Sequence, residues 1–400
     1  MILGLLKEPG DETRVALLPE LVKELVAAKV EVLTENLTGE KAFVTDADYE
    51  AAGAKVASRQ AIFERAEVLL QIQAPSDSDL ALIKKSQVWI SVFNPLWETT
   101  LVETFLKKGL TTFSLDSIPR STRAQAMDIL SSMATVAGYK AVLEAALRLP
   151  TFFPMFMTAA GTIRPANVLI LGAGVAGLQA IATARRLGAQ VQVFDVRSAV
   201  KEEVMSLGGK FVEVEGAIED KAAGGYAVEQ TEDFKKKQQE AIDLHAAKAN
   251  VIICTAQIPG RKAPVLIHKL TVENMKPGSV IIDLAASSGG NCELTENDKT
   301  VVHHGVTIIG QSNYPSQMSV DASRMFGKNV FNFLKLIIGE EGALHLNFDD
   351  DIVKGTCITH EGEVLNEQVK SVVNKNDGIK SESIGTSKTE KKTESENKKI

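Results

Sequence analysis

A glycine-rich turn between an apolar segment and an amphipathic segment has the spacing needed to hold a dinucleotide. Residues 169–197 read LILGAGVAGLQAIATARRLGAQVQVFDVR and contain the pattern GxGxxG. The first glycine of such a pattern permits a sharp turn, the second lets the backbone approach a pyrophosphate, and the third lets the helix pack on the strand. The start of that helix offers free N–H groups and a positive dipole end to phosphate. The predicted phosphate-binding residues are Gly172, Gly174, Val175, Ala176 and Gly177.

An acidic residue ends the next apolar run. Asp195 lies 18 residues beyond Gly177, where a carboxylate can accept hydrogen bonds from both ribose hydroxyls. Its charge repels a 2′-phosphate, so the sequence predicts NAD rather than NADP. Val196 and Arg197 follow directly and are predicted to border the same ribose.

Two other interpretations of this segment are less consistent with its residues. A glycine-rich turn can connect a strand and a helix without binding a ligand, but here strand, helix, second strand and acid all lie in register. Pro165–Ala184 carries no charge and is long enough for a membrane span. Its three glycines and Gln179 argue against a span.

Composition restricts the class of protein. The net charge of −7 and the aromatic content of 5% disfavour a nucleic-acid partner. Cys254, Cys292 and Cys357 are widely spaced, which is typical of reduced thiols rather than a disulfide framework or a metal site. His303 and His304 are adjacent, and neighbouring residues on a strand face opposite ways, so no shared metal-ligand role is expected. The opening MILGLLKEP lacks the features of a targeting peptide and predicts a cytoplasmic protein.

Alternating apolar and amphipathic segments predict an α/β fold with two doubly wound parallel-sheet lobes, joined by long helices. The second lobe is predicted to be a Rossmann domain. First-lobe strands are predicted at Ile2–Leu6, Val30–Leu33, Val68–Gln71, Val88–Ser91 and Thr111–Ser114, with helices at Pro19–Ala28, Asp46–Ala52, Arg59–Ala66 and Leu101–Lys108. Second-lobe strands are predicted at Val168–Leu171, Val191–Asp195, Lys210–Val214, Val251–Cys254, Val280–Asp283 and Thr307–Ile309.

The remaining segments set the expected boundaries. Long helices are predicted at Ser121–Leu149 and Ser319–Ile338, a proline-rich linker at Pro150–Pro165, and a flap or solvated helix at Ala223–Gln239. The Lys-, Glu-, Ser- and Thr-rich end has almost nothing to bury and predicts disorder. The predicted organisation is a discontinuous N-terminal lobe (1–125 and 325–366), a connecting helix and linker (126–165), a Rossmann domain (166–312), a return segment (313–324) and a disordered tail (367–400).

Several ordered motifs together resemble the NAD-binding component of proton-translocating NAD(P) transhydrogenase, a superfamily shared with alanine dehydrogenase. The opening KEPGDETRVALLPE contains Lys7, Glu8 and Arg14 of the entry motif. The resemblance continues through IPRSTRAQAMDILSSMATVAGYKAV, the glycine-rich turn, GGYA, IPGRKAPVLI, MKPGSVIIDLA and GGNC, and covers about residues 1–365.

Two positions separate the two families. The resemblance places a lysine and a histidine of alanine dehydrogenases at the positions that Gln73 and Asn94 occupy in this chain. Oxidation of an amino acid requires a proton acceptor, and neither amide titrates near neutral pH. Hydride transfer between two nicotinamides needs no base, so the sequence favours transhydrogenation. The other interpretation is that both amides are ordinary polar residues at strand ends.

The resemblance also implies residues close to the nicotinamide. Arg120, Gln125, Asp128 and Ser131 match the family's set before the long helix. The last three are spaced by three and share one face if helical, whereas an ordinary helix start capped by Ser121 or Thr122 explains the same pattern without a ligand. The resemblance likewise assigns Tyr226 to a mobile loop over bound NAD(H), and Gln257 lies beside the expected nicotinamide crevice.

The resemblance implies a function within a complex, as the separately encoded, soluble first segment of a divided alpha subunit. The chain is expected to bind NAD(H) and to exchange hydride, as a transhydrogenase of the Si/Re-specific type, with NADP(H) on a beta subunit. The membrane-spanning second segment of the alpha subunit is expected to carry the protons, which would place this homodimer in the cytoplasm at the inner membrane. A free-standing alanine-type dehydrogenase and a non-catalytic NAD(H) sensor stay as alternatives.

Overall fold

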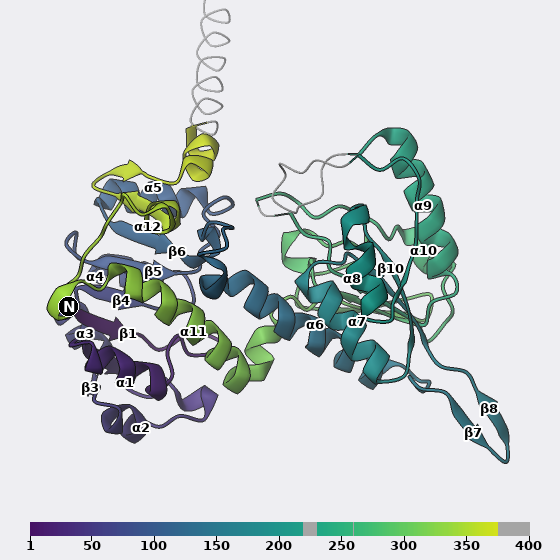
Figure 1. Ribbon diagram of the computed structural model, residues 1–400, viewed down its shortest axis with the longest axis horizontal. Coiled ribbons are helices and arrows are strands. Elements are labelled where there is room, and N and C mark those ends of the chain that lie inside the picture. Colours follow the sequence, from purple (N-terminus) through teal and green to yellow (C-terminus); the bar gives the residue numbers. More distant parts are fainter. Residues whose placement is uncertain (219–229, 259, 375–400) are drawn as a thin grey trace, which may run out of the picture. The chain divides into compact units, whose positions relative to one another are not determined.

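A computed structural model describes residues 1–218, 230–258 and 260–374 (Figure 1). The predicted loop residue Tyr226 and the tail beyond residue 374 lie outside these ranges. The chain forms two compact units. Unit 1 consists of Met1–Ile129 together with the described residues from Ser323 onward, and unit 2 of Leu130–Ala322.

Unit 1 is built on a largely parallel sheet in the order β17-β16-β6-β5-β4-β1-β2-β3. Its strands are β1 (Ile2–Leu5), β2 (Glu31–Glu35), β3 (Lys55–Ala57), β4 (Val68–Leu70), β5 (Val88–Ser91), β6 (Thr111–Ser114), β16 (Cys357–His360) and β17 (Glu363–Val364). Its helices are α1 (Pro19–Ala27), α2 (Asp46–Ala51), α3 (Arg59–Arg65), α4 (Asp77–Leu82), α5 (Thr99–Lys108) and α12 (Asp351–Thr356). The strands predicted here are confirmed with small differences at their ends. The short β3 and the C-terminal pair β16–β17 were not expected.

Local sequence explains these elements. The central strands β4, β5 and β6 are buried along their whole length, as expected for parallel strands covered on both faces. Helices α2, α3 and α4 begin where the side chains of Thr45, Ser58 and Ser76 accept a hydrogen bond from the backbone three residues on.

The C-terminal end of the described chain is more ordered than expected. Residues 367–374 are helical, although the tail was predicted to be disordered from position 367. Val369 and Val373 are buried in an apolar cluster that also contains Phe105 and Ile358. The two valines lie one helical turn apart and form the apolar face of this helix. Because the residues around them are mostly charged or polar, composition did not reveal this face.

Unit 2 contains a second, mainly parallel sheet in the order β11-β10-β9-β12-β13-β15-β14. Its strands are β9 (Asn167–Leu171), β10 (Gln190–Phe194), β11 (Lys210–Phe211), β12 (Val251–Cys254), β13 (Val280–Asp283), β14 (Thr300–His303) and β15 (Val306–Ile309). Its helices include α6 (Ile129–Arg148), α7 (Val175–Arg186), α8 (Lys201–Ser206), α9 (Glu232–Ala246) and α10 (Lys269–Glu273). The chain adds β10 and β11 on one side of β9 and then β12, β13 and β15 on the other side. This reversal of direction confirms the predicted doubly wound Rossmann arrangement. Helix α11 (Ser319–Ile337), which the helical pattern of the sequence predicted, runs from unit 2 into unit 1.

The predicted helix Ser121–Leu149 begins later than expected. Gln125–Met127 form a 3₁₀ turn, and Asp128 has an extended ψ of 92°, so α6 starts only at Ile129. The carbonyl of Ala126 accepts hydrogen bonds from the side-chain amides of Asn329 and Asn332, at 2.9 and 3.0 Å. Two side chains about two hundred residues further along the chain thus donate hydrogen bonds to the Ala126 carbonyl, at the point where the chain is not yet α-helical.

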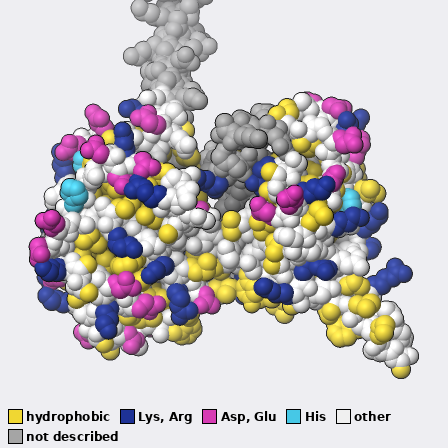
Figure 2. All heavy atoms as spheres, viewed as in Figure 1, with side chains coloured by type: hydrophobic (Ala, Val, Ile, Leu, Met, Phe, Trp, Pro, Cys, Tyr) yellow, Lys and Arg dark blue, Asp and Glu magenta, His cyan; other side chains and the backbone are white. Residues whose placement is uncertain are grey.

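The proline-rich segment predicted as a linker contains a β-hairpin instead. Strands β7 (Phe156–Thr158) and β8 (Gly161–Ile163) pair antiparallel, and all their residues are exposed. The hairpin extends away from the rest of unit 2 (Figure 1). Hydrophobic side chains, including Phe156, Met157 and Ile163, lie on its surface (Figure 2).

Candidate nucleotide-binding site

The turn after β9 has the backbone geometry that its glycines predict. Gly172 has φ of +103°, a conformation that residues with a Cβ rarely adopt. A Cβ at this position would lie 2.5 Å from Thr255 Oγ1. The Thr255 hydroxyl in turn donates to the carbonyls of Leu171 and Gly172, at 3.2 and 3.0 Å. The turn is therefore held against the end of β12.

Helix α7 approaches this turn so closely that only glycine fits at its third position. A Cβ on Gly177 would lie 2.0 Å from the carbonyl oxygen of Gly172. On another side, a Cβ on Gly138 of α6 would lie 2.1 Å from the carbonyl oxygen of Ala176. Sequence reasoning did not identify Gly138, since its only local signal is an isolated glycine in a helical pattern.

The second glycine of the pattern is different, because it faces open space. A Cβ on Gly174 would meet nothing within 4 Å. Gly174 is the N-cap of α7, and the N–H groups of the first helical turn, from Val175 onward, have no partners within the helix. An open backbone next to a helix N-terminus fits a pyrophosphate.

The acidic residue after β10 is held by two kinds of donor. Asp195 accepts a hydrogen bond from the N–H of Ala173 at 2.7 Å, which ties it to the glycine-rich turn. Both its oxygens also accept bonds from the Arg197 guanidinium, at 2.9 and 2.7 Å. The hydrogen bond to Asp195 raises the pKa of Arg197. The carboxylate is well placed for a ribose, but it carries a cationic partner that the sequence pattern did not reveal.

The carboxyl ends of β12 and β13 are connected by a buried polar network. Asp283 is fully buried and accepts bonds from the N–H groups of Ala285, Asn291 and Cys292 and from the Thr295 hydroxyl, at 2.7–3.0 Å. Burial raises the pKa of Asp283.

The side chain of Asn291, fully buried itself, extends the network. It accepts from the N–H of Ala256 at 3.0 Å and donates to the carbonyls of Ala256 and Pro264, at 2.9 and 2.8 Å. The predicted site residue Gln257 donates to the Leu284 carbonyl at 3.0 Å. Asp283 and Asn291 thus order the loops of this edge, a role that the sequence alone did not reveal.

In unit 1, Gln73 and Asn94 both lie just beyond strand ends, and the amide of Gln73 has a structural role. Gln73 donates from its amide to Glu12 at 3.2 Å. Glu12 also holds Arg14 by two bonds of 2.8 and 2.6 Å. Although burial acts to raise it, the pKa of Glu12 is lowered by Arg14. The guanidinium is therefore already neutralised by a carboxylate of the same chain.

Two buried acids complete these strand ends. Glu8 accepts bonds from the N–H groups of Ile72 and Gln73, at 2.6 and 3.1 Å, and burial raises the pKa of Glu8 to about 8. Asn94 has a left-handed φ of +46°, and its N–H donates to Asp116 at 2.9 Å. Burial raises the pKa of Asp116.

The four residues predicted near the nicotinamide do not share a helical face. Gln125 is in a 3₁₀ turn, Asp128 is extended, and only Ser131 belongs to α6. Arg120 precedes them in an exposed loop segment. The interpretation of a single helical face is therefore wrong, and their role toward a ligand stays a prediction.

The glycine-rich turn, helix α7 and Asp195 define a dinucleotide-binding α/β protein with a second α/β unit. Comparison of the sequence identifies the family: the chain belongs to the alanine dehydrogenase/PNT family, whose N-terminal domain model matches residues 4–137 and whose C-terminal domain model matches residues 141–367.

Individual relatives agree with this assignment. A protein from Rhodospirillum rubrum that is named as the first part of NAD(P) transhydrogenase subunit alpha is 47% identical over 368 residues, covering 90% of this chain and 96% of the relative. The protein of the same name from Rickettsia prowazekii is 41% identical over 91% of this chain and 96% of its own. The crystal structure of a transhydrogenase from Sinorhizobium meliloti superposes with a TM-score of 0.83 at 41% identity, covering 91% of this chain and all of that chain.

Alanine dehydrogenases are more distant, as the resemblance in sequence predicted. That of Mycolicibacterium smegmatis is 27% identical over 92% of this chain and 96% of its own. Among the residues that the structure describes, no helix is long and apolar enough to cross a membrane.

The different surroundings of Gly174 and Gly177 yield a paired prediction. Gly177→Ala places a methyl against the Gly172 carbonyl and is expected to lower the free energy of unfolding by about 2–3 kcal/mol. Gly174→Ala meets open space and is expected to cost less than about 1 kcal/mol, yet to weaken NADH binding at least about tenfold by obstructing the pyrophosphate. Denaturant unfolding and fluorescence titration measure the two effects. A Gly174→Ala variant that unfolds as readily as Gly177→Ala would contradict this assignment.

Proposed function

We propose that this chain is the NAD(H)-binding component of a proton-translocating NAD(P) transhydrogenase. The proposal rests on the open glycine-rich turn of unit 2. It is supported by Gln73 and Asn94 of unit 1, which the resemblance aligns with a lysine and a histidine of alanine dehydrogenases. The relatives named as a segment of transhydrogenase subunit alpha support it over nearly the whole chain.

The chemistry matches these residues. Hydride leaves C4 of NADH with the electron pair of the broken C–H bond and forms a C–H bond at C4 of NADP⁺. NADH is oxidised, NADP⁺ is reduced, and neither ring gains or loses a proton. The protein has to hold the two rings in contact and exclude water. The amides of Gln73 and Asn94 are compatible with this reaction, because they are uncharged and do not titrate and the reaction needs no proton acceptor.

The other steps of the reaction belong to other chains in this proposal. NADP(H) is bound on a beta subunit, and the membrane-spanning second segment of the alpha subunit conducts the protons, so that this chain lies at the cytoplasmic face of the inner membrane. Arg120, Gln125, Asp128 and Ser131 orient the nicotinamide, and Tyr226 and Gln257 border the nucleotide. Transfer is of the Si/Re-specific type.

NAD is proposed as the bound nucleotide because of the charge at Asp195. Its carboxylate, 6% exposed and tied to the turn by Ala173, occupies the place where a 2′-phosphate would come close. The positive charge of Arg197 lowers the net repulsion between Asp195 and a 2′-phosphate. The selectivity for NAD over NADP therefore depends on the carboxylate staying in its position between the turn and the ribose.

A reconstitution assay tests the proposed reaction. The full chain is mixed with a purified NADP-binding partner domain, NADPH and an NAD analogue whose reduced form has its own absorbance. We expect reduction of the analogue that requires both proteins. Absence of transfer between two folded partners that each bind their nucleotide would overturn the proposal.

The same preparation distinguishes the alternatives. An alanine-type dehydrogenase would consume NADH with pyruvate and ammonia without a partner; the amides at positions 73 and 94, which cannot act as a base, argue against this. A non-catalytic sensor would bind NADH and show no turnover in either assay.

A pair of substitutions tests nucleotide selectivity. Asp195→Asn removes the charged ribose acceptor and is expected to weaken NADH binding by about 1–3 kcal/mol. It also frees Arg197, so the ratio of NADPH to NADH affinity should rise. Arg197→Gln leaves the carboxylate unneutralised and should move that ratio the other way. Titration of both nucleotides against both variants measures it. Unchanged NADH affinity in Asp195→Asn would remove Asp195 from the site.

A homodimer is also proposed, and the hairpin β7–β8 is a surface suited to it. Phe156 and Met157 are 42% and 75% exposed, and exposed apolar patches mark protein contacts. Phe156→Ser combined with Met157→Ser is expected to shift the mass measured by light scattering from dimer toward monomer. Val302→Ser, on the exposed strand β14 of the same unit, is the matched control. A dimer that persists unchanged in the double variant would exclude the hairpin as the contact.

A further inference from the structure

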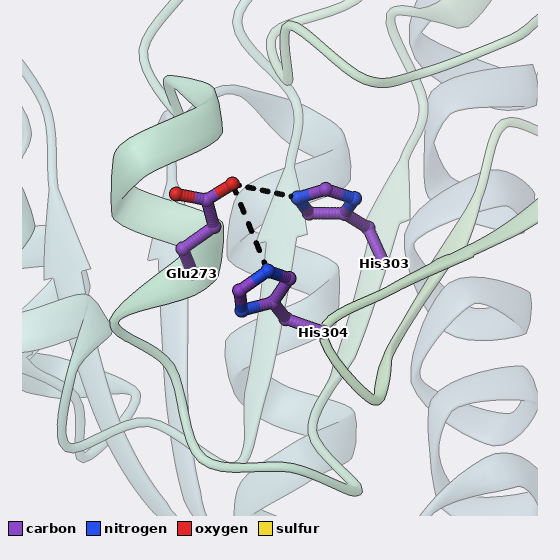
Figure 3. A group of neighbouring side chains, drawn as sticks. All are labelled: Glu273, His303 and His304. Carbon is purple, nitrogen blue, oxygen red and sulfur yellow. Dashed lines mark hydrogen bonds and ion pairs between the residues drawn. The ribbon is translucent and has the colours of Figure 1, made fainter.

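Three potential metal-binding side chains gather on unit 2 away from the glycine-rich turn. Glu273 ends α10, His303 ends β14, and His304 follows it (Figure 3). One Glu273 oxygen lies 3.0 Å from His303 Nε2 and 3.9 Å from His304 Nε2. The three potential ligand atoms all lie within 4.8 Å of one another.

The turn between β14 and β15 brings the two histidines to one side. Neighbouring residues on a strand face opposite ways, which is why the sequence predicted no joint role for them. His304, however, has left the strand: its φ is +48°, and Gly305 follows with φ of +74°. Positive φ at both residues, between the paired His303 and Val306, is the pattern of a type I′ hairpin turn. The two imidazole rings stack, with centroids 4.8 Å apart and an interplanar angle of 29°.

The backbone at His304 is unusual for its residue type. A type I′ turn favours asparagine, aspartate or glycine at its first position because φ is positive there. A histidine at this position is less common, and the turn directs its ring toward Glu273 beside that of His303.

We propose that Glu273, His303 and His304 form a binding site for a divalent transition-metal ion. Two imidazole nitrogens and one carboxylate oxygen are a ligand set that Zn²⁺ accepts, with water as a fourth ligand. Ligands about 2.0–2.1 Å from a tetrahedral ion lie roughly 3.3 Å apart. The two carboxylate–imidazole separations of 3.0 and 3.9 Å straddle that value, and all three ligand atoms lie within 4.8 Å of one another, so a bound ion would draw the exposed His304 ring closer.

An ordinary ion pair is the competing explanation. Lys269 Nζ lies 3.9 Å from the same Glu273 oxygen, so the carboxylate already has a cation nearby. That ammonium is 56% exposed on a flexible stem and competes weakly with a metal ion. An ion pair also requires only one histidine, whereas here both Nε2 atoms point at one carboxylate (Figure 3).

The position of the site determines what the metal can do. His303 and His304 lie at the amino end of β15, which is parallel to β13 and, through β12, to β9. The glycine-rich turn lies at the opposite, carboxyl end of these strands, displaced by about 13–17 Å along the strand direction from the rise of four to five residues, and by three strand spacings across the sheet. Bound metal would therefore link α10 to the β14–β15 hairpin and stabilise unit 2 without contacting the nucleotide.

Calorimetric titration of the full, untagged chain with ZnCl₂ tests this site. We expect one ion per chain, and His303→Gln or His304→Gln should each weaken binding about tenfold or more by removing a ligand. His268→Gln is the matched control, because His268 is an exposed histidine beside a single carboxylate at the other end of α10, with its Nδ1 3.5 Å from Glu293. That variant should bind as the unmodified chain does.

Spectroscopy and unfolding complete the test. With Cu²⁺ as the probe, electron paramagnetic resonance should show two imidazole nitrogens, and one in either single variant. Zn²⁺ should raise the thermal midpoint of the unmodified chain, reversibly on addition of EDTA, but not that of the double histidine variant. Equal Zn²⁺ affinity of the double variant and the unmodified chain, or no binding at millimolar Zn²⁺, would overturn the proposal.

Discussion

The nucleotide-binding unit depends on one backbone contact, between Gly177 in the first turn of α7 and the carbonyl of Gly172 at the end of β9. There is no room for even a methyl group between them. This contact fixes the helix against the strand and therefore the direction in which its N-terminus points. It also lets α6 approach from the other side, where Gly138 meets the Ala176 carbonyl under the same constraint. The turn, α7 and α6 can pack this closely because each of the two contacts joins a glycine to a backbone carbonyl.

Around that contact, buried charges are held by more than one partner each. Asp195 is tied to the turn through Ala173 and to Arg197 through two bonds. Asp283 accepts four bonds from one loop. A buried carboxylate with several donors resists displacement, because moving it would leave each donor unsatisfied. The carboxyl edge of the unit 2 sheet is thus preorganised, and binding there needs little rearrangement of these residues.

Sequence predicted the elements and site residues that local patterns determine. Spacing identifies the glycines of the turn and Asp195, and periodicity identifies the central strands and α11. The start of α6 could not be predicted in this way, since two asparagine side chains of α11 occupy the carbonyl of Ala126 from far along the chain. The hairpin β7–β8 buries neither face, so its sequence shows no alternation of apolar and polar residues that would predict strands. The network of Asp283 and Asn291 depends on contacts between separate loops, which no local pattern records.

The strand ends of unit 1 contain the contacts that bear on the proposed reaction. A base at position 73 would face Glu12 and compete with Arg14 for that carboxylate. Glutamine instead donates to Glu12 and leaves the ion pair with Arg14 intact. The result is a hydrogen-bonded cluster in which the side chain at position 73 is uncharged, and Glu8, whose pKa burial raises to about 8, accepts bonds from two backbone N–H groups. Such a cluster would obstruct the oxidation of an amine, and it places no obstacle in the way of hydride passing between two nicotinamide rings.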